Sequence, residues 1–283
     1  MKQLKPIFKF VAGFFIPHSV VCIVKTQRRK QNVACKEAER ATLLQEYRSR
    51  SGTAHFDYGK AVAFLTQEGV DEHHVRDGSM PEASLAFCAM KLGELLGTKK
   101  PLIGLHVGNF VGVSLGAFTE AARSLHAESF VLAVDPNIPH RGVSHPQDKV
   151  AKLLSFFGLQ NHVLLTCGYT MKKSFSNDDV VIQNYDPRAA FVSEFGFENV
   201  LPKLAALCPQ QFDFAVIDGN HEQGYLEKEL QEVAKLLRPG GVLIVDDVSE
   251  HWFGVKAAFE KFAKKSTVKV VGEDGRVGIV QLQ

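Results

Sequence analysis

Three acids and one histidine lie where an α/β sheet would gather them. Asp218 ends an apolar run that begins at Phe212, His221 follows three residues later, and Asp246 and Asp247 end a second apolar run. An amphipathic segment and a Pro-Gly-Gly break separate the two runs, which predicts a β-α-β unit. Ligands bind at the carboxyl ends of the strands in open α/β sheets. We therefore expect the four side chains to converge at one rim, where carboxylates and an imidazole can hold a ligand and transfer protons.

A glycine-containing turn and a further acid precede this unit. The apolar run Pro101–Val107 predicts a buried strand, and Gly108 and Gly112 lie in the turn that follows it. Glycines at these positions let the backbone approach a ligand closely and leave helix N–H groups free to bind an anionic group. A tight turn without a ligand is the alternative. The next apolar run ends in Asp135, whose carboxylate can bind both hydroxyls of a ribose, so the two features together indicate a nucleoside site.

The order of apolar and amphipathic segments predicts an α/β fold, a Rossmann-like three-layer sandwich around a mostly parallel seven-stranded sheet. The expected strands cover residues 101–107, 130–134, 162–166, 212–218, 240–247, 268–272 and 277–282, the last two forming a C-terminal antiparallel hairpin. The expected helices cover residues 58–68, 80–96, 113–124, 147–157, 195–207 and 252–265, with another starting near residue 222. The stretch around His73 and His74 is expected to be a polar loop, and residues 171–187 either a substrate loop or a surface insertion.

The composition indicates one main domain that acts on small molecules. A chain of 283 residues with 45% hydrophobic residues can bury one substantial core. The net charge of +2 leaves no overall electrostatic attraction for nucleic acid, so no nucleic-acid partner is expected. The five cysteines are odd in number and form no C-x-x-C pair, which argues against a disulfide framework or a zinc site. A reducing, cytoplasmic location fits this pattern.

The N-terminus has an apolar run, Ile7–Val24, that is interrupted by polar residues. The run is short for a membrane-spanning helix and lacks the small-residue cleavage site of a signal peptide. Three interpretations stay open. The run can form a helix packed on the domain or on a partner in a homo-oligomer, a helix at a membrane surface with the basic residues of Lys25–Lys30 at its end, or a true span.

The order of these motifs resembles the class I S-adenosylmethionine-dependent methyltransferases over about residues 82–283. The resemblance implies that S-adenosylmethionine is a cofactor and assigns the binding residues. In this assignment the glycine turn binds the methionine end of the cofactor, Asp135 binds the ribose, the turn around residue 168 lies at the adenine, and Asp218 borders the cofactor. The full set of cofactor-binding residues is Gly108, Asn109, Gly112, Ser114, Asp135, Gly168, Thr170 and Asp218. The family commonly has an acid two residues before the first glycine, where this chain has His106. The cofactor's amino group would then be held differently, or more weakly.

The chain would divide into a helical extension, residues 1–80, serving as a membrane-surface, lid or dimer segment, and a methyltransferase domain, residues 81–283.

Within this class, IDGNH at Ile217–His221 and GGVLIVDDV at Gly240–Val248 are similar to metal-dependent O-methyltransferases that act on sugars in glycosides and natural products. That likeness implies a sugar or other small-molecule acceptor, with Asp218 and His221 in catalysis and His221 as general base. It also implies Mg²⁺ on Asp218, Asp246 and Asp247. A sulfonium methyl group is already activated, so the enzyme must mainly position the acceptor and remove its proton. A metal ion would lower the pKa of the acceptor hydroxyl.

Several alternatives remain at this stage. A metal-free enzyme would use His221 or an acid alone, and a protein that keeps the fold without catalysis would use neither. An oxidoreductase is disfavoured because Gly108 and Gly112 are four residues apart and form no G-x-G-x-x-G motif. Individually, Asp247 and His221 can be helix caps, and Asp246 can pair with a lysine or arginine.

Overall fold

The structure is a computed structural model that describes residues 42, 45, 56–97, 100–172 and 199–283. All of these except Thr42 belong to one structural unit, Leu43–Gln283. The predictions for the N-terminal apolar run and for nearly all of the 171–187 connection lie outside the described residues. Within the described part of the chain, no helix combines the length and the apolar character needed to cross a membrane.

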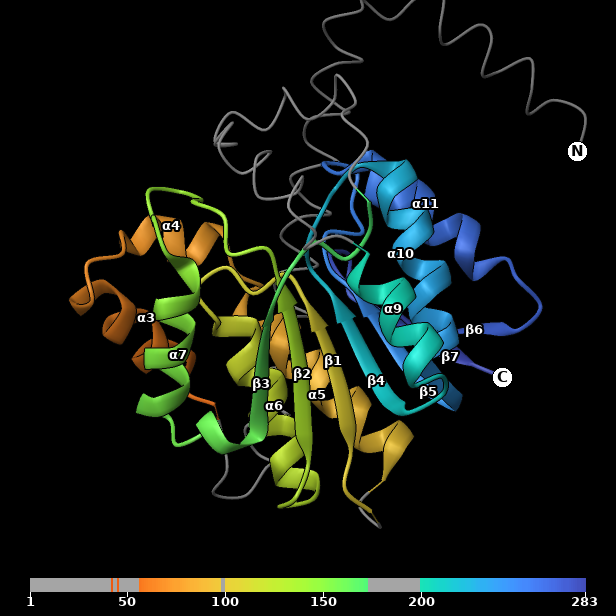
Figure 1. Ribbon diagram of the computed structural model, residues 1–283, viewed down its shortest axis with the longest axis horizontal. Helices are drawn as coiled ribbons and strands as arrows, with labels where there is room; N and C mark the ends of the chain where they lie inside the picture. The colour runs from red at the N-terminus through yellow and green to blue at the C-terminus, as the bar shows by residue number, and fades with distance from the viewer. Residues whose placement is uncertain (1–41, 43–44, 46–55, 98–99, 173–198) are drawn as a thin grey trace, which may run out of the picture. The chain divides into compact units, whose positions relative to one another are not determined.

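Seven strands form one sheet in the order β3-β2-β1-β4-β5-β7-β6 (Figure 1). The first five strands in the chain pair in parallel. The seventh strand pairs antiparallel with both the fifth and the sixth, so the last two strands form a closing hairpin. They are β1 (Ile103–Val107), β2 (Phe130–Asp135), β3 (Val163–Cys167), β4 (Phe212–Ile217), β5 (Leu237–Val245), β6 (Val268–Glu273) and β7 (Gly278–Leu282). The predicted fold class is confirmed. Since β1 has β2 on one side and β4 on the other, the chain reverses its direction of travel across the sheet here, and such a switch point opens a crevice at the carboxyl ends of the two strands.

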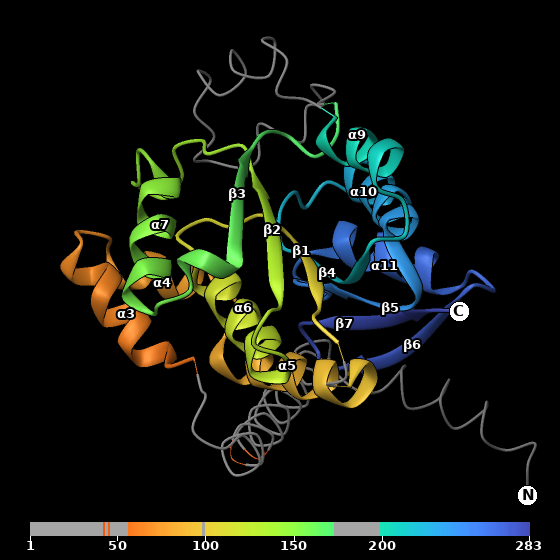
Figure 2. The same cartoon turned by 60° about the horizontal axis from the view of Figure 1, so that its bottom comes forward.

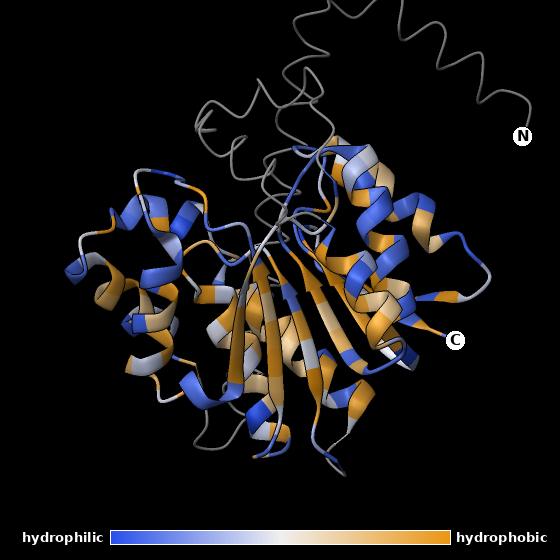
Figure 3. Ribbon diagram, viewed as in Figure 1, coloured by the Kyte–Doolittle hydropathy of each residue, from blue (hydrophilic) through white to orange (hydrophobic). Residues whose placement is uncertain are grey.

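Helices cover both faces of this sheet (Figures 1 and 2). On one face lie α3 (Tyr58–Gln67), α4 (Glu72–Asp77), α5 (Glu82–Leu96), α6 (Val113–Leu125) and α7 (Pro146–Phe156), and on the other α9 (Val200–Leu207), α10 (Gln223–Leu236) and α11 (Phe253–Ala263). A short 3₁₀ turn, η1 (Gln160–His162), leads into β3. Most of the length of β1, β2, β4 and β5 is apolar (Figure 3), because both faces of these strands meet a helix layer.

On the central strands, alternate residues enter opposite halves of the core. On β4, Phe214 and Val216 pack against the α5 and α6 side, whereas Ala215 and Ile217 pack against α10. The large ring of Phe214 fits because Gly104 faces it: a β-carbon there would lie 2.2 Å from the ring. The β1–β4 pair is therefore closely packed directly below the rim.

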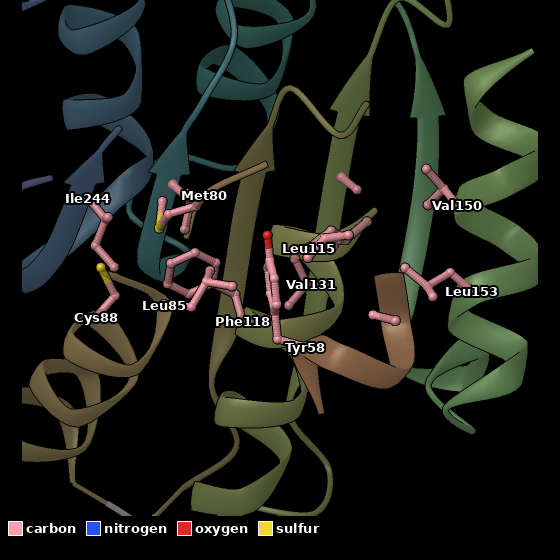
Figure 4. Packing of buried hydrophobic residues seen from close by; sticks show 14 of the residues in the cluster. Tyr58, Met80, Leu85, Cys88, Leu115, Phe118, Val131, Val150, Leu153 and Ile244 are labelled. Atoms are coloured by element: carbon pink, nitrogen blue, oxygen red, sulfur yellow. The ribbon is translucent and has the colours of Figure 1, made fainter. Parts of the chain in front are cut away.

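Helices α3 and α4 contribute to the same core as the sheet. Tyr58 of α3 and Met80, which follows α4, are buried in the cluster shown in Figure 4 with Phe118 and Val131. The described part of the predicted extension thus packs into the unit that starts at Leu43, and the functional division of the chain at residue 80 stays a prediction.

The local prediction for the stretch around His73 and His74 was wrong. The stretch expected to be a polar loop forms α4, because the Asp71 carboxylate accepts hydrogen bonds from the backbone N–H groups of His73 at 2.8 Å and His74 at 3.4 Å. This N-cap satisfies donors that a short helix leaves unpaired. Val75 is fully buried and attaches the helix to the core.

Candidate active site

The rim above β1 and β4 brings the predicted residues together. Backbone hydrogen bonds join neighbouring strand ends: Asp218 N–H donates to Val107 O at 2.9 Å, and Asp246 N–H donates to Ile217 O at 3.0 Å. The acids that end β4 and β5 therefore lie side by side, next to the turn that leaves β1. Parallel pairing places them there, because strand ends in register share one edge of the sheet.

The turn after β1 depends on glycine at both predicted positions. Gly108 has a φ of 80°, and a β-carbon on it would lie 1.9 Å from the carbonyl oxygen of Asp218. Gly112 has a φ of 93° and is the N-cap of α6. Only glycine adopts these angles without strain. The contact between Gly108 and Asp218 joins the two halves of the site through backbone atoms.

Asp135, at the end of β2, is fixed by the same turn. Its Oδ2 accepts a hydrogen bond from Asn109 N–H at 2.7 Å, and its Oδ1 accepts one from Asn137 N–H at 2.7 Å. Burial raises the pKa of Asp135, and backbone hydrogen bonds from Asn109, Asn137 and Phe110 partly offset this effect. A carboxylate can accept about four hydrogen bonds, so the group can still accept one from a ligand's hydroxyl.

His106 lies on the core side of the turn, away from the acids. The side chain is completely buried and 6.0 Å from the ring of Phe118. Its Nδ1 is 3.1 Å from Asn109 Oδ1, and its Nε2 has no hydrogen-bond partner among the described residues. Burial lowers the pKa of His106 to about 4, so the ring is neutral at physiological pH. With the amide oxygen of Asn109 facing it, Nδ1 carries the proton, and His106 orients the turn without adding a charge.

The two cofactor-binding residues predicted in the turn after β3 lie in different surroundings. Gly168 N–H donates to Asp135 O at 3.0 Å, which keeps this turn beside the carboxylate. The Thr170 hydroxyl instead lies in the core under α10, bonded to Glu229 and 3.0 Å from the Tyr225 hydroxyl. Thr170 therefore holds the turn in place from below.

Three acids, a histidine and an arginine form the other half of the site. The guanidinium group of Arg276 donates to both oxygens of Asp246, each at 2.8 Å. Asp247 lies between two partners: its Oδ2 is 3.2 Å from His221 Nε2, and its Oδ1 is 3.4 Å from Arg276 Nη2. Ligand-type atoms of Asp218, His221 and Asp247 all lie within 4.8 Å of one another. Figure 1 shows the ends of the strands that carry these acids.

The three carboxyl groups have different electrostatic surroundings. Burial raises the pKa of Asp218 well above its ordinary range, and the charges of Asp246 and Asp247 raise it further, although Ser114 donates a hydrogen bond to it. Burial also raises the pKa of Asp246, against the opposing effect of Arg276. For Asp247, burial acts in the same direction, but the hydrogen bond from His221 and the charge of Arg276 outweigh it and lower the pKa. Of the three acids, Asp247 is thus the one whose surroundings favour the ionised form, and it lies beside the histidine.

The helix-cap alternatives for Asp247 and His221 do not hold. Asn220 Oδ1 accepts a hydrogen bond from Glu222 N–H at 2.7 Å before α10, and no side chain caps the first residues of that helix. Helix α11 begins at Phe253, well after Asp247. The His221 side chain instead lies against the Trp252 ring, with ring centroids 4.1 Å apart.

A family model described as "Methyltransferase domain" matches residues 105–248, about half of the chain, including the glycine turn and every acid of the rim. The chain belongs to this methyltransferase family. No curated protein matches it. The resemblance to class I methyltransferases is confirmed by the family and by the fold of its structural neighbours.

Three solved structures illustrate the fold of the methyltransferase. A Podospora anserina methyltransferase bound to S-adenosylhomocysteine matches 87% of this chain and 95% of its own at 15% identity, with a TM-score of 0.54. An O-methyltransferase of Bacillus cereus, in complex with the same compound, matches 82% and 94% at 15% identity and a TM-score of 0.53. A Geobacter sulfurreducens methyltransferase matches 81% and 90% at 13% identity and a TM-score of 0.51.

The acids of the methyltransferase do not fit an Mg²⁺ centre made of three carboxylates. Both oxygens of Asp246 are bonded to Arg276, so this acid has no side-chain oxygen left without a cationic partner. The group that does lie close together, Asp218, His221 and Asp247, replaces one oxygen ligand with nitrogen. Mg²⁺ prefers oxygen ligands in near-ideal octahedral geometry, which this arrangement does not offer.

Sequence reasoning missed three side chains at the rim. Arg276 and Trp252 come from segments predicted only as a hairpin connection and a helix start. His140 lies in the loop after β2, where its ring is 5.3 Å from that of Phe110; burial and the nearby charges of Arg141 and His221 lower its pKa to about 4. No pattern in the sequence singled these residues out, since each meets the site only through tertiary packing.

Proposed function

We propose that this methyltransferase transfers the methyl group of S-adenosylmethionine to a hydroxyl oxygen of a small molecule, with His221 as the general base. The observation that carries the proposal is the pairing of His221 with Asp247 at 3.2 Å, next to a glycine turn and an acid suited to a nucleoside. The B. cereus neighbour supports oxygen as the acceptor atom, because it is an O-methyltransferase in complex with S-adenosylhomocysteine.

In this proposal the cofactor lies over the turn after β1. The turn that contains Gly108 and Gly112 ends at the N-terminus of α6, which attracts the carboxylate at the methionine end of the cofactor. Asp135 binds the ribose hydroxyls with its free lone pairs. The neutral His106 cannot neutralise the cofactor's ammonium group, so that group is left to backbone oxygens of the turn or to Asp218 across the Gly108 contact.

His221 removes the proton of the acceptor hydroxyl. Because Nε2 faces Asp247, Nε2 carries the hydrogen and Nδ1 has the lone pair that accepts the proton. The charge that forms on the ring is stabilised by Asp247, whose pKa is lowered and which therefore stays ionised. Asp218 has a strongly raised pKa, and in its protonated form it can donate a hydrogen bond to the acceptor.

A sugar or glycoside is the acceptor class that the sequence resemblance suggests. Trp252 supports it, because its partly exposed ring lies beside the base and offers a flat apolar surface for one face of a sugar ring. Its position next to His221 would direct a ring hydroxyl, rather than an extended chain, toward the base.

Magnesium assistance is a prediction of the sequence resemblance alone, and the proton transfer proposed above does not depend on it. If Mg²⁺ is required, EDTA abolishes turnover and added Mg²⁺ restores it. We expect EDTA to leave the rate unchanged, because the Asp246 carboxylate is already balanced by Arg276.

The experiment that tests the function combines binding and product formation. Calorimetry with S-adenosylmethionine on the full chain should show binding, and incubation with labelled cofactor and small-molecule extracts should yield a labelled ether product. A folded sample that binds no cofactor would instead favour a non-catalytic protein that keeps the fold. His221→Ala should keep cofactor binding and lower the rate by about two to four orders of magnitude. His126→Ala, at the other end of α6, is the matched control and should behave like the wild type.

A further inference from the structure

Arg276 has an unusually well-fixed backbone for a residue between two hairpin strands. Asp274 Oδ1 accepts hydrogen bonds from Arg276 N–H at 2.8 Å and from Val277 N–H at 2.7 Å, while Ser84 of α5 donates to Asp274 Oδ2 at 2.6 Å. The carbonyl oxygen of Arg276 accepts a hydrogen bond from Val248 N–H at 2.6 Å. The arginine is therefore tied to the helix layer and to the loop after β5.

The side chain of Arg276 extends this support to the acids. Its bidentate contact with Asp246 is the strongest geometry available to an arginine and a carboxylate. The Asp246 side chain is 1% exposed and that of Arg276 is 24% exposed, so the pair is largely removed from water. Breaking such a pair is costly because it leaves a buried charge without compensation.

The same guanidinium group reaches Asp247, which holds the base. Asp247 has one oxygen toward Arg276 and the other toward His221. The Arg276 charge and the His221 ring thus bind opposite oxygens of one carboxylate.

We infer that Arg276 is a built-in cation that takes the place of a metal ion at this rim: it neutralises Asp246 and positions Asp247, and through Asp247 it orients His221. The role in orienting His221 rests on the proposed function, whereas the replacement of a metal does not. An arginine cannot lose its charge in a protein and needs no loading from solution, so the site is complete without a bound ion.

Removing the cation should turn the acids into a metal site. In Arg276→Gln, Asp218, Asp246 and Asp247 remain close together with no arginine to balance them, and carboxylate oxygens bind Mn²⁺ well. Calorimetry with Mn²⁺ alone on the full chain should show no saturable binding to the wild type. Arg276→Gln should bind one Mn²⁺, with an affinity at least about tenfold higher than any affinity of the wild type for Mn²⁺.

Three further variants make the experiment specific. Arg276→Lys keeps a positive charge and should still exclude Mn²⁺. Asp246→Asn combined with Arg276→Gln should lose the acquired binding, because it removes an acid as well. Arg238→Gln is the matched control: Arg238 also pairs with a buried acid, Asp213, at 2.9 Å, but at the opposite ends of the strands. It should acquire no Mn²⁺ binding.

The outcomes separate this inference from the proposed function. One equivalent of Mn²⁺ bound by the wild type as tightly as by Arg276→Gln would overturn the inference, and so would a folded Arg276→Gln that binds none. If the variant does not fold alone, circular dichroism with and without Mn²⁺ decides: recovery of the fold by the ion supports the inference, and no recovery refutes it. Binding of S-adenosylmethionine to the wild type is measured on the same protein preparation. If the wild type binds no S-adenosylmethionine, that result counts against the proposed function only.

Discussion

Glu229 should make the stability of the protein fall as pH rises, and Glu229→Gln should remove this dependence. The side chain is 1% exposed in α10, and one of its oxygens, Oε2, has no hydrogen-bond partner among the described residues. Burial raises the pKa of Glu229 from 4.5 to about 8, although the hydrogen bond from Thr170 opposes this. The folded state therefore binds the proton more tightly than the unfolded state does.

The sign and size of the effect follow from linkage between proton binding and folding. With a raised folded pKa, the favourable contribution is complete below the unfolded pKa of 4.5 and is lost as pH rises toward about 8. Each pH unit in that window costs about 1.4 kcal/mol per proton, so the loss between about pH 5 and about pH 7 is about 2 to 3 kcal/mol. The neutral amide introduced by Glu229→Gln does not titrate, so the variant lacks this contribution at every pH.

Urea unfolding at these two pH values measures the effect. Other acids also titrate, so the quantity of interest is the free energy of unfolding of the wild type minus that of Glu229→Gln at each pH. This difference should fall by about 2 to 3 kcal/mol from the lower to the higher pH. Glu120→Gln, which removes a buried carboxyl group bonded to Arg123, controls for the amide replacement. A difference that does not change with pH would refute the claim that Glu229 is buried in its neutral form.

Three further predictions concern the turn, the core and the N-terminus. Gly108→Ala should weaken S-adenosylmethionine binding and lower the free energy of unfolding by at least about 1 kcal/mol, because the new β-carbon would lie 1.9 Å from Asp218 O. Calorimetry with the cofactor and urea unfolding measure the two effects, and unchanged curves would contradict this prediction. Phe214→Ala should cost about 3 to 5 kcal/mol in urea unfolding, since it empties the space under the rim, and a loss below about 1 kcal/mol would mean that the core collapses around it. Full-length protein should sediment weakly with anionic liposomes through Lys25–Lys30, whereas a chain starting at Asn32 should not; equal sedimentation would rule out membrane-surface contact by this segment.

The sheet was predictable because its apolar runs end in distinctive residues. The expected strand 130–134 is β2 without its final acid, and the strand that ends at Asp218 is β4. The start of β5 was placed too late. Leu237 pairs with Phe212, and the Pro-Gly pair that predicted a break lies inside the strand, where Gly240 has a φ of 79° and the register shifts. Local residue preferences cannot distinguish a bulge in a strand from the end of a strand.

The partners of the acids were less predictable than their positions. The possibility that Asp246 pairs with an arginine or lysine was open from the sequence, but Arg276 is thirty residues further along and reaches it only because β7 pairs antiparallel with β5. Likewise, the Thr170 hydroxyl points under α10 because Tyr225 and Glu229 offer it partners there. Strand-end chemistry can be read from sequence, whereas the pairing of charges depends on how distant segments cross.

The position of the proposed base follows from strands rather than from loops. Asp247 directly follows the strand end at Asp246, Asp246 is hydrogen-bonded through its backbone to β4, and Arg276 holds both acids from the hairpin. The proposed cofactor half is attached to the same elements, since Gly108 lies against Asp218 and the Asp135 carboxylate accepts a hydrogen bond from the glycine turn. A methyl transfer needs donor, acceptor and base in line, and small displacements cost rate. Because the proposed cofactor site and base are both positioned by the parallel strands β2, β1, β4 and β5, the acceptor is the component whose orientation depends on side chains such as Trp252. Substitutions there should change specificity before they change the chemistry.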